Sequence, residues 1–221
     1  DLNISRDDQE EFAINSHKKA LEAIKKGKFE NEIIPVDKYG ECTVDKDDGP
    51  RDPDLEKIKS LNPAFIENGS ITAATSSPIS VGASAMLISS ESFASEHGLK
   101  TRAEFVSRAV SGVHWDRMGM GPLPAVEKAL KKAGLKMDDV ETIELNEAFA
   151  AQALYVIRKG GWDENKINLN GGAIALGHPL GCSGARIITT LLNVMEQQNT
   201  HTGLATMCIG SGQGIATIIK R

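Results

Sequence analysis

Three separate segments of the sequence carry side chains that could move protons. His178 lies between Gly177 and Pro179, Cys208 ends an apolar run, and Asn146 precedes a predicted helix. An imidazole and a thiol can act as general acid and base, and an amide can hydrogen-bond to a polar reacting group. The three residues together predict an acid–base site.

Glycines follow or precede two of these residues. Gly177 lets the loop of His178 approach other backbone closely, and Pro179 partly rigidifies that loop. Gly210 and Gly212 follow Cys208 and expose backbone N–H groups at which a developing oxyanion could sit.

Each candidate also has a purely structural explanation. His178 could be a loop histidine bonded to a neighbouring carbonyl, and Cys208 could be a buried thiol that packs as a small hydrophobic group. Asn146 could cap the helix that it precedes. Only the combination of the three favours catalysis.

Alternating strands and helices are expected to position these segments. From residue 102 onward, the pattern predicts strands at 105–113, 142–145, 167–169, 203–209 and 214–219, and helices at 125–133, 147–158 and 184–195. This order predicts an α/β layer sandwich. Such sheets bind ligands where strands end, so residues 146–149, 170–179 and 208–212 are expected to converge at one edge.

The first part of the chain has a different pattern. Ser5 followed by acidic residues predicts the cap of an amphipathic helix that runs through Phe12 to Ile24. Residues 38–53 predict a charged surface loop, and residues 82–89 predict a buried apolar segment.

Composition excludes several classes of protein. Of 221 residues, 40% are hydrophobic, which suffices for a globular core. No apolar run reaches the ~18 residues of a membrane span, and no signal-peptide pattern opens the chain. The net charge of −5, without a basic stripe, argues against a nucleic-acid partner. Three cysteines do not form a disulfide framework, which indicates a reducing compartment.

The sequence resembles the thiolase family in several segments. Its three C-terminal signatures look like NEAFAAQ at residues 146–152, NGGAIALGHPLGCSGAR at 170–186 and CIGSGQG at 208–214, in that order. Residues 4–20 (ISRDDQEEFAINSHKKA) are similar to the thiolase loop region, and residues 71–87 (ITAATSSPISVGASAML) to the end of its first core domain. The resemblance covers essentially the whole chain.

This resemblance implies a layered α/β/α sandwich with a mixed five-stranded sheet in a complete C-terminal domain. It divides the chain into a remainder of the loop domain at 1–65, the end of the N-terminal core domain at 66–100 and the C-terminal domain at 101–221. Most of the N-terminal core domain is then expected to be missing.

The resemblance also implies a reaction. A 3-ketoacyl-CoA is cleaved by a second CoA to acetyl-CoA and a shortened acyl-CoA, with the acyl group held on a nucleophilic cysteine. By the family pattern, His178 would activate that nucleophile and Cys208 would be the acid and base. Asn146 would hold a water, and the N–H of Gly210 would belong to an oxyanion hole.

Coenzyme A and acyl-CoA are implied as substrates, with neither a permanently bound cofactor nor a metal. Ser77 and Ala73 match positions that line the pantetheine in the family. Ala148 and Phe149 would lie beside the same tunnel, and Arg51 matches an arginine near the adenine end.

The nucleophile of the family has no counterpart in this sequence. It occurs in a C-x-S-G context in the first half of the enzyme, whereas Cys42 stands in ECTVD and Cys182 in the GHP segment. Cys42 lacks the glycine or helix N-terminus that would lower a thiol pKa. The isolated chain is therefore expected to be unable to form an acyl-enzyme.

Within the family, the sequence is most similar to bacterial β-oxidation 3-ketoacyl-CoA thiolases, with acetoacetyl-CoA thiolase (acetyl-CoA C-acetyltransferase) as the alternative. A non-catalytic acyl-CoA-binding fragment is a second alternative. A ketoacyl synthase is a third, although synthases have histidine where Cys208 stands. We further expect a cytoplasmic homodimer or homotetramer, with a β-oxidation multienzyme complex as a candidate partner and no membrane span.

Overall fold

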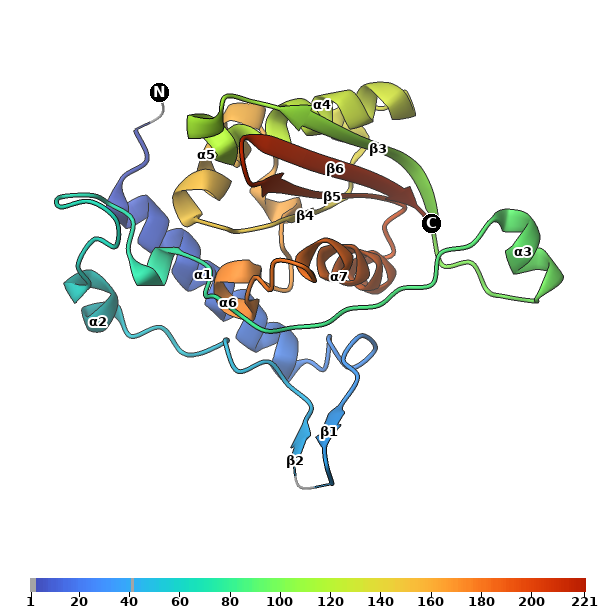
Figure 1. The fold of residues 1–221 in the computed structure, drawn as a ribbon, viewed down its shortest axis with the longest axis horizontal. Helices are drawn as coiled ribbons and strands as arrows, with labels where there is room; N and C mark the ends of the chain where they lie inside the picture. The colour runs from blue at the N-terminus through green and yellow to red at the C-terminus, as the bar shows by residue number, and fades with distance from the viewer. Residues whose placement is uncertain (1–2, 41) are drawn as a thin grey trace. The chain divides into compact units, whose positions relative to one another are not determined.

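The computed structural model describes residues 3–40 and 42–221, which divide into two compact units. Unit 1 consists of Asp1–Val81 and Asn146–His178, and unit 2 consists of Gly82–Leu145 and Pro179–Arg221. Figure 1 shows the elements of both units, coloured along the chain.

Helix α1 (Arg6–Lys25) is the longest element of unit 1. Ser5 Oγ accepts the N–H of Asp8 at 3.0 Å, and the Asp8 carboxylate accepts the N–H of Ser5 at 2.8 Å, which forms a capping box. This start confirms the helix and the cap predicted from the sequence. Ala13 packs with Ala150 of α5 (Ala150–Gly160) and Ile174 of α6 (Ala173–Leu176), so three segments share one small core.

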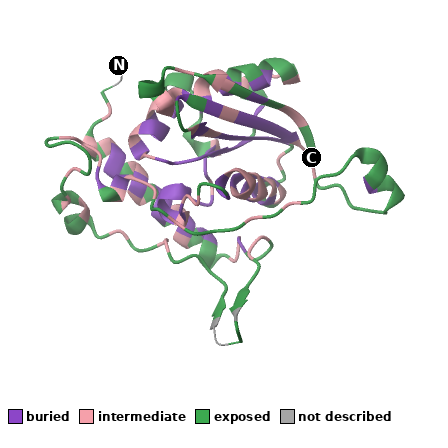
Figure 2. Cartoon of the chain, viewed as in Figure 1, coloured by how far each residue is buried: buried purple, intermediate pink, exposed green. Residues whose placement is uncertain are grey.

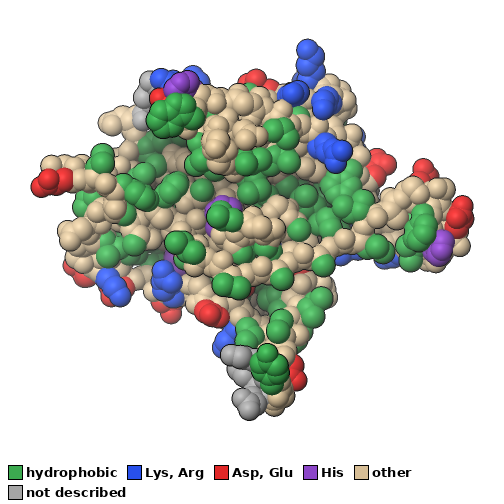
Figure 3. All heavy atoms as spheres, in the orientation of Figure 1, with side chains coloured by type: hydrophobic (Ala, Val, Ile, Leu, Met, Phe, Trp, Pro, Cys, Tyr) green, Lys and Arg blue, Asp and Glu red, His purple; other side chains and the backbone are tan. Residues whose placement is uncertain are grey.

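Short elements complete unit 1. A β-hairpin of β1 (Val36–Lys38) and β2 (Cys42–Val44) interrupts the segment predicted as an irregular loop. Hydrophobic side chains are exposed on this hairpin, where Val36, Tyr39 and Val44 are 62%, 93% and 50% exposed (Figure 3). The remaining elements are α2 (Leu55–Ser60) and the 3₁₀ turns Ala73–Thr75 and Glu164–Lys166.

A mixed four-stranded sheet forms the centre of unit 2. Its order is β3 (Glu104–Gly112), β6 (Gln213–Lys220), β5 (Thr202–Ile209) and β4 (Thr142–Leu145). β4 and β5 are parallel and the other two pairs are antiparallel. All four residues of β4 are buried, whereas the outer strand β3 is largely exposed (Figure 2).

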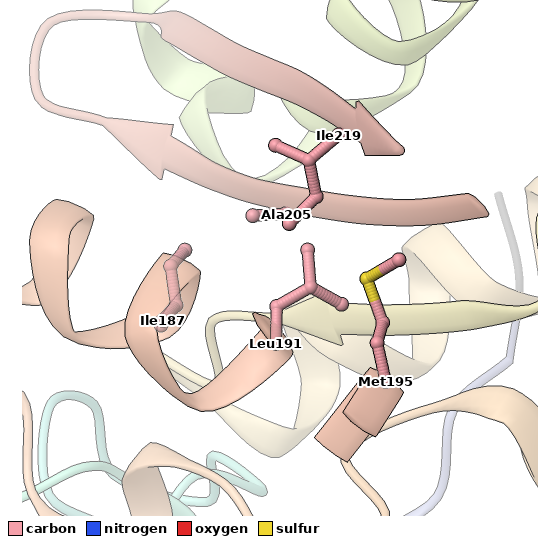
Figure 4. Packing of buried hydrophobic residues seen from close by; sticks show 5 residues of the cluster. All are labelled: Ile187, Leu191, Met195, Ala205 and Ile219. Carbon is pink, nitrogen blue, oxygen red and sulfur yellow. The ribbon is translucent and has the colours of Figure 1, made fainter. Parts of the chain in front are cut away.

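Two helices of unit 2 cover opposite faces of this sheet (Figure 1). α7 (Ser183–Gln198) packs against Ala205 of β5 and Ile219 of β6 through Ile187, Leu191 and Met195 (Figure 4). α4 (Pro122–Ala133) lies on the other face and ends at Gly134, whose φ of 66° is the left-handed C-cap predicted from the sequence. Unit 2 also contains α3 (Glu91–Glu96) and the 3₁₀ segments Trp115–Met120 and Met137–Asp139.

The prediction of a fifth strand at residues 167–169 is wrong for the described part of the chain. Ile167 instead ends a 3₁₀ turn, and Asn168 has a φ of 46°, which lies in the left-handed region. Ile167 is an isolated bridge residue and not part of a strand, and the side chain of Asn168 bonds to Glu147 at 2.8 Å. The other four predicted strands and the three helices after residue 102 are present.

The prediction of a buried segment at residues 82–89 is also wrong. Its residues form neither helix nor strand and are mostly exposed, with Leu87 at 80% and Ile88 at 64% (Figure 2). Apolar character alone therefore misled the prediction, because burial also requires a surface that packs against the segment.

No helix within residues 3–40 and 42–221 combines the length and the apolar character needed to cross a bilayer.

We expect Leu191→Ala to lower the free energy of unfolding by about 2–5 kcal/mol, because it leaves a cavity in the core of unit 2. Leu191 is 0% exposed. Leu180→Ala is the control, since Leu180 is 79% exposed and its loss should change stability by at most about 0.5 kcal/mol. Urea denaturation followed by circular dichroism measures both, and equal effects would contradict the packing described.

Candidate active site

Asn146 and His178 come together in unit 1 although 32 residues separate them. Asn146 directly follows β4, and His178 follows α6 through Gly177. Nδ2 of Asn146 lies 3.3 Å from Nε2 of His178. Asn146 is 1% exposed, and its Oδ1 has no hydrogen-bond partner among the described residues. The amide thus contacts the imidazole at one end and has a buried acceptor at the other.

Glu147, the next residue, is hydrogen-bonded to three other segments of unit 1. Its Oε2 accepts the hydroxyl of Ser16 at 2.7 Å and the N–H of Ile174 at 3.1 Å, and its Oε1 accepts the amide of Asn168 at 2.8 Å. Ser16 Oγ in turn accepts the N–H of Gly172 at 3.0 Å. A Cβ at Gly172 would overlap the carboxylate, so a larger residue there would have to displace Glu147 from these bonds.

Burial sets the protonation behaviour of Glu147. Glu147 is 2% exposed, and this burial raises the pKa of its carboxyl group. The hydrogen bonds from Ser16, Asn168 and the Ile174 N–H act in the opposite direction, with a smaller contribution from the charge of Lys19.

Three of the residues assigned to the coenzyme A site also lie together in unit 1. Ser77 donates both its N–H, at 3.0 Å, and its hydroxyl, at 3.2 Å, to the carbonyl of Ala148. Ser76 and Phe149 form an isolated β-bridge beside this contact. The segment around residue 77 is therefore hydrogen-bonded to the residues directly before α5.

Phe149 also lines an apolar cleft of about 350 Å³. Its ring meets that of Phe65 edge to face, with centroids 5.8 Å apart. Ile66, Gly69 and Ile71 form the rest of the lining. The lining suits an apolar chain, and Phe65 is a lining residue that was not predicted from the sequence.

The two other predicted coenzyme A residues are more isolated. Ala73 is exposed in its 3₁₀ turn, and Arg51 is exposed with its guanidinium donating to the carbonyl of Gly49 at 3.2 Å. Burial, with a smaller contribution from the charge of Arg51, lowers the pKa of His17. The assignment of Ala73 and Arg51 to coenzyme A stays a prediction.

Cys208 and Gly210 lie together in unit 2, at the hairpin that joins β5 to β6. Cys208 pairs with Gly214 in the sheet and is 6% exposed. Gly210 is exposed, and no described atom lies within 4 Å of where a Cβ would be. Ser211 and Gly212 both have positive φ values, 64° and 82°, which turn the chain back.

Neither described cysteine has the surroundings of an activated thiolate. Burial raises the pKa of the Cys208 thiol, which a hydrogen bond to the backbone only partly opposes. Burial also raises the pKa of Cys182, against the charge of Arg186. The side chain of Cys42 lies outside the described part of the structure.

The hydrogen-bond network around Glu147 was not predicted from the sequence. Ser16, Glu147 and Asn168 carry no recognisable catalytic spacing, because 131 and 21 residues separate Glu147 from its two side-chain partners. One signal was available: a glutamate within the apolar run around residues 142–150, where a buried carboxylate needs donors.

Comparison with known families identifies the chain. Residues 99–221 match the model of the thiolase C-terminal domain, and residues 1–92 match that of the thiolase N-terminal domain. The chain belongs to the thiolase family. The expectation of a largely missing N-terminal domain needs correction, because a 92-residue stretch of this thiolase matches the model of that domain. The boundary predicted at residue 65 stays a prediction.

Known bacterial enzymes are similar along the whole chain. A 3-ketoacyl-CoA thiolase of Psychrobacter cryohalolentis is 54% identical over 228 residues, and one of Acinetobacter baumannii is 56% identical over 227 residues. Each alignment covers 99% of this chain and 58% of the relative, so the chain spans little more than half the length of these proteins.

Solved structures support the same fold. The crystal structure of the Bacillus anthracis acetyl-CoA acetyltransferase has a TM-score of 0.95 at 40% identity. That of human mitochondrial 3-ketoacyl-CoA thiolase has a TM-score of 0.90 at 38% identity. Both matches cover 98% of this chain and 56% of the other.

We expect the Cys208 thiol of this thiolase chain to react slowly with iodoacetamide at pH 7. Its rate should rise at pH values above ~8.5, the ordinary thiol pKa, because burial keeps the thiol protonated. Peptide mass mapping over time measures the rate, with the urea-unfolded chain as control. Alkylation at pH 7 as fast as in the unfolded chain would contradict the assignment.

Proposed function

We propose that this chain carries the acid–base and coenzyme A-binding residues of a 3-ketoacyl-CoA thiolase, an acetyl-CoA C-acyltransferase of fatty-acid β-oxidation. Such an enzyme cleaves a 3-ketoacyl-CoA with CoA to give acetyl-CoA and a shortened acyl-CoA. The observation that carries the proposal is the contact between Asn146 Nδ2 and His178 Nε2 at 3.3 Å, in the unit that also holds the Ser77 to Ala148 contact.

Cys208 is the proton donor and acceptor in this proposal. Cleavage of the bond between the α and β carbons leaves an electron pair on the α carbon of acetyl-CoA, and the Cys208 thiol protonates it. The resulting thiolate then takes the proton of the incoming CoA thiol, which restores Cys208. The raised pKa of the Cys208 thiol supports a neutral thiol before the reaction begins.

His178 and Asn146 serve the other end of the reaction. His178 activates the nucleophilic cysteine, which belongs to a part of the relatives that this chain does not match. The buried Oδ1 of Asn146 suits it to accept a hydrogen bond from a water. That water and His178 would stabilise the oxygen of the thioester or enolate, and the Gly210 N–H would stabilise that of the acyl-enzyme.

Coenzyme A is the substrate that the remaining residues would contact. Phe149 lines the apolar cleft of unit 1, and the preceding residue, Ala148, bonds to Ser77. The apolar lining suits the hydrocarbon part of the pantetheine arm. Ala73 is exposed on the same segment as Ser77. Arg51 is exposed and positively charged, as a contact to the adenine end requires.

Two alternatives have support of their own. The B. anthracis structure, at a TM-score of 0.95, is named an acetyl-CoA acetyltransferase, which favours acetoacetyl-CoA as the substrate. Neither described cysteine has a lowered thiol pKa that would make it a nucleophile, which favours a chain that binds acyl-CoA without forming an acyl-enzyme of its own. As in the family, we propose a cytoplasmic homodimer or homotetramer, and a β-oxidation multienzyme complex as partner.

We expect the isolated chain to bind CoA without forming an acyl-enzyme, because neither described thiol is activated. Incubation with acetyl-CoA followed by intact-mass measurement tests this. A full-length bacterial 3-ketoacyl-CoA thiolase is the positive control. A stoichiometric acyl adduct on Cys182 or Cys208 would show that the chain carries its own nucleophile.

We expect activity when the chain is combined with the part of a bacterial thiolase that it does not match. Cleavage of a long-chain 3-ketoacyl-CoA should exceed that of acetoacetyl-CoA, and the reverse order would favour the acetyltransferase. His178→Ala should lower kcat by about 10²–10⁴-fold, the size of a lost general base. His201→Ala is the control, since His201 is exposed. A complex that forms but cleaves neither substrate rejects the enzyme proposal.

A further inference from the structure

The contact between Asn146 and His178 depends on how their backbones are held. A single contact of 3.3 Å joins the two side chains, which is long for a hydrogen bond. The second polar end of Asn146, Oδ1, has no partner among the described residues. The side chain of Asn146 therefore cannot fix its own orientation by bonds on both ends.

Glu147 connects the two backbones. It is covalently next to Asn146, and its Oε2 accepts the N–H of Ile174 at 3.1 Å. Ile174 lies in α6, which ends at Gly177 directly before His178. The segments at 146–147 and 174–178 are therefore joined at two points: by the Asn146 to His178 contact and by the Glu147 to Ile174 bond. Together they form a closed ring of contacts.

Two further segments brace this ring. Ser16 of α1 donates to the same oxygen of Glu147 at 2.7 Å, and Asn168 donates to the other oxygen at 2.8 Å. Ser16 also accepts the N–H of Gly172 at 3.0 Å. With Glu147 2% exposed, water cannot easily replace these bonds.

We propose that Glu147, braced by Ser16 and Asn168, is a positioning residue that sets the geometry of the Asn146–His178 pair. Its importance for the reaction rests on the proposed function, but the geometry itself does not. Glu147 bonds with Ser16, Asn168 and Ile174, so in this proposal it acts on the reaction only through Asn146 and His178.

The hydrogen bonds, rather than the charge, carry this role. A glutamine at 147 can present its oxygen to Ser16 and Ile174, while Asn168 can turn its amide to accept from the glutamine nitrogen. An alanine leaves all three donors without their acceptor. Glu147→Gln is therefore the conservative variant, and Glu147→Ala is the disruptive one.

The experiment follows the imidazole of His178 by ¹⁵N nuclear magnetic resonance in the full chain, without substrate. The hydrogen bond made by one ring nitrogen sets which nitrogen carries the proton, so the signals report the contact with Asn146. His178→Asn identifies the signals among those of the five histidines. We expect Glu147→Ala to move both ring signals and Glu147→Gln to leave them close to the wild type.

Glu141→Ala is the matched control. The Glu141 carboxylate also accepts two N–H groups, from His201 and Thr202 at 2.8 and 2.9 Å, but it lies in unit 2. It should leave the His178 signals unchanged. Thermal unfolding of each variant separates stability from positioning, because a merely structural role would lower the melting temperature without moving these signals.

The proposal would be overturned if Glu147→Ala folds and its His178 signals match those of the wild type. It would also be overturned if the His178 signals of Glu147→Gln move as far from the wild type as those of Glu147→Ala. If Glu147→Ala does not fold, Ser16→Ala decides. It removes one donor, and it should move the His178 signals in the direction of the Asn146→Ala variant by a smaller amount. Unchanged signals in Ser16→Ala would then overturn the proposal. None of these readouts requires activity, so failure here is distinct from failure of the proposed function.

Discussion

A carboxylate removed from water loses several kcal/mol of hydration unless protein donors replace the solvent. Glu147 is 2% exposed, and its three donors come from α1, from the turn at Asn168 and from α6. Hydrogen bonding of the Glu147 carboxylate therefore requires these three segments to lie close together. Asn146 is the residue directly before Glu147 in the chain, so its backbone position is tied to theirs. In the proposal, the geometry of Asn146 and His178 follows from the need of the buried Glu147 carboxylate for hydrogen-bond donors.

In unit 2, the property that matters at the end of β5 is the protonation state of the Cys208 thiol. Cys208 is buried near the end of β5, where it pairs with Gly214 of β6, and burial raises the pKa of its thiol and favours the neutral form. The chain then turns through Gly210, Ser211 and Gly212. A neutral thiol is a proton donor first and becomes a base only after it has given up its proton. Hydrogen bonds thus determine how the candidate residues of unit 1 are positioned, whereas burial determines the protonation state of Cys208 in unit 2.

Local patterns were enough to predict most of the regular structure. The cap at Ser5, the C-cap at Gly134 and the strands β5 and β6 follow from signals within a few residues. The strand predicted at residues 167–169 is not formed: Asn168 has a φ in the left-handed region, and its side chain bonds to Glu147, 21 residues away in the chain. A local apolar run does not record such a contact. Asn146, His178 and Cys208 were found by residue type and by resemblance. Ser16 was not, because its partner is 131 residues distant and no short pattern records such a contact.

Hydrogen exchange at Gly172 and Ile174 tests the central role of the Glu147 network most directly. These N–H groups precede or begin α6, where a helix supplies no partner of its own, and they bond only to Ser16 Oγ and Glu147 Oε2 in the described structure. Native-state exchange measured by nuclear magnetic resonance should find both amides strongly protected, opening only when unit 1 unfolds. Exchange of either amide at the rate of an unprotected peptide would contradict the account.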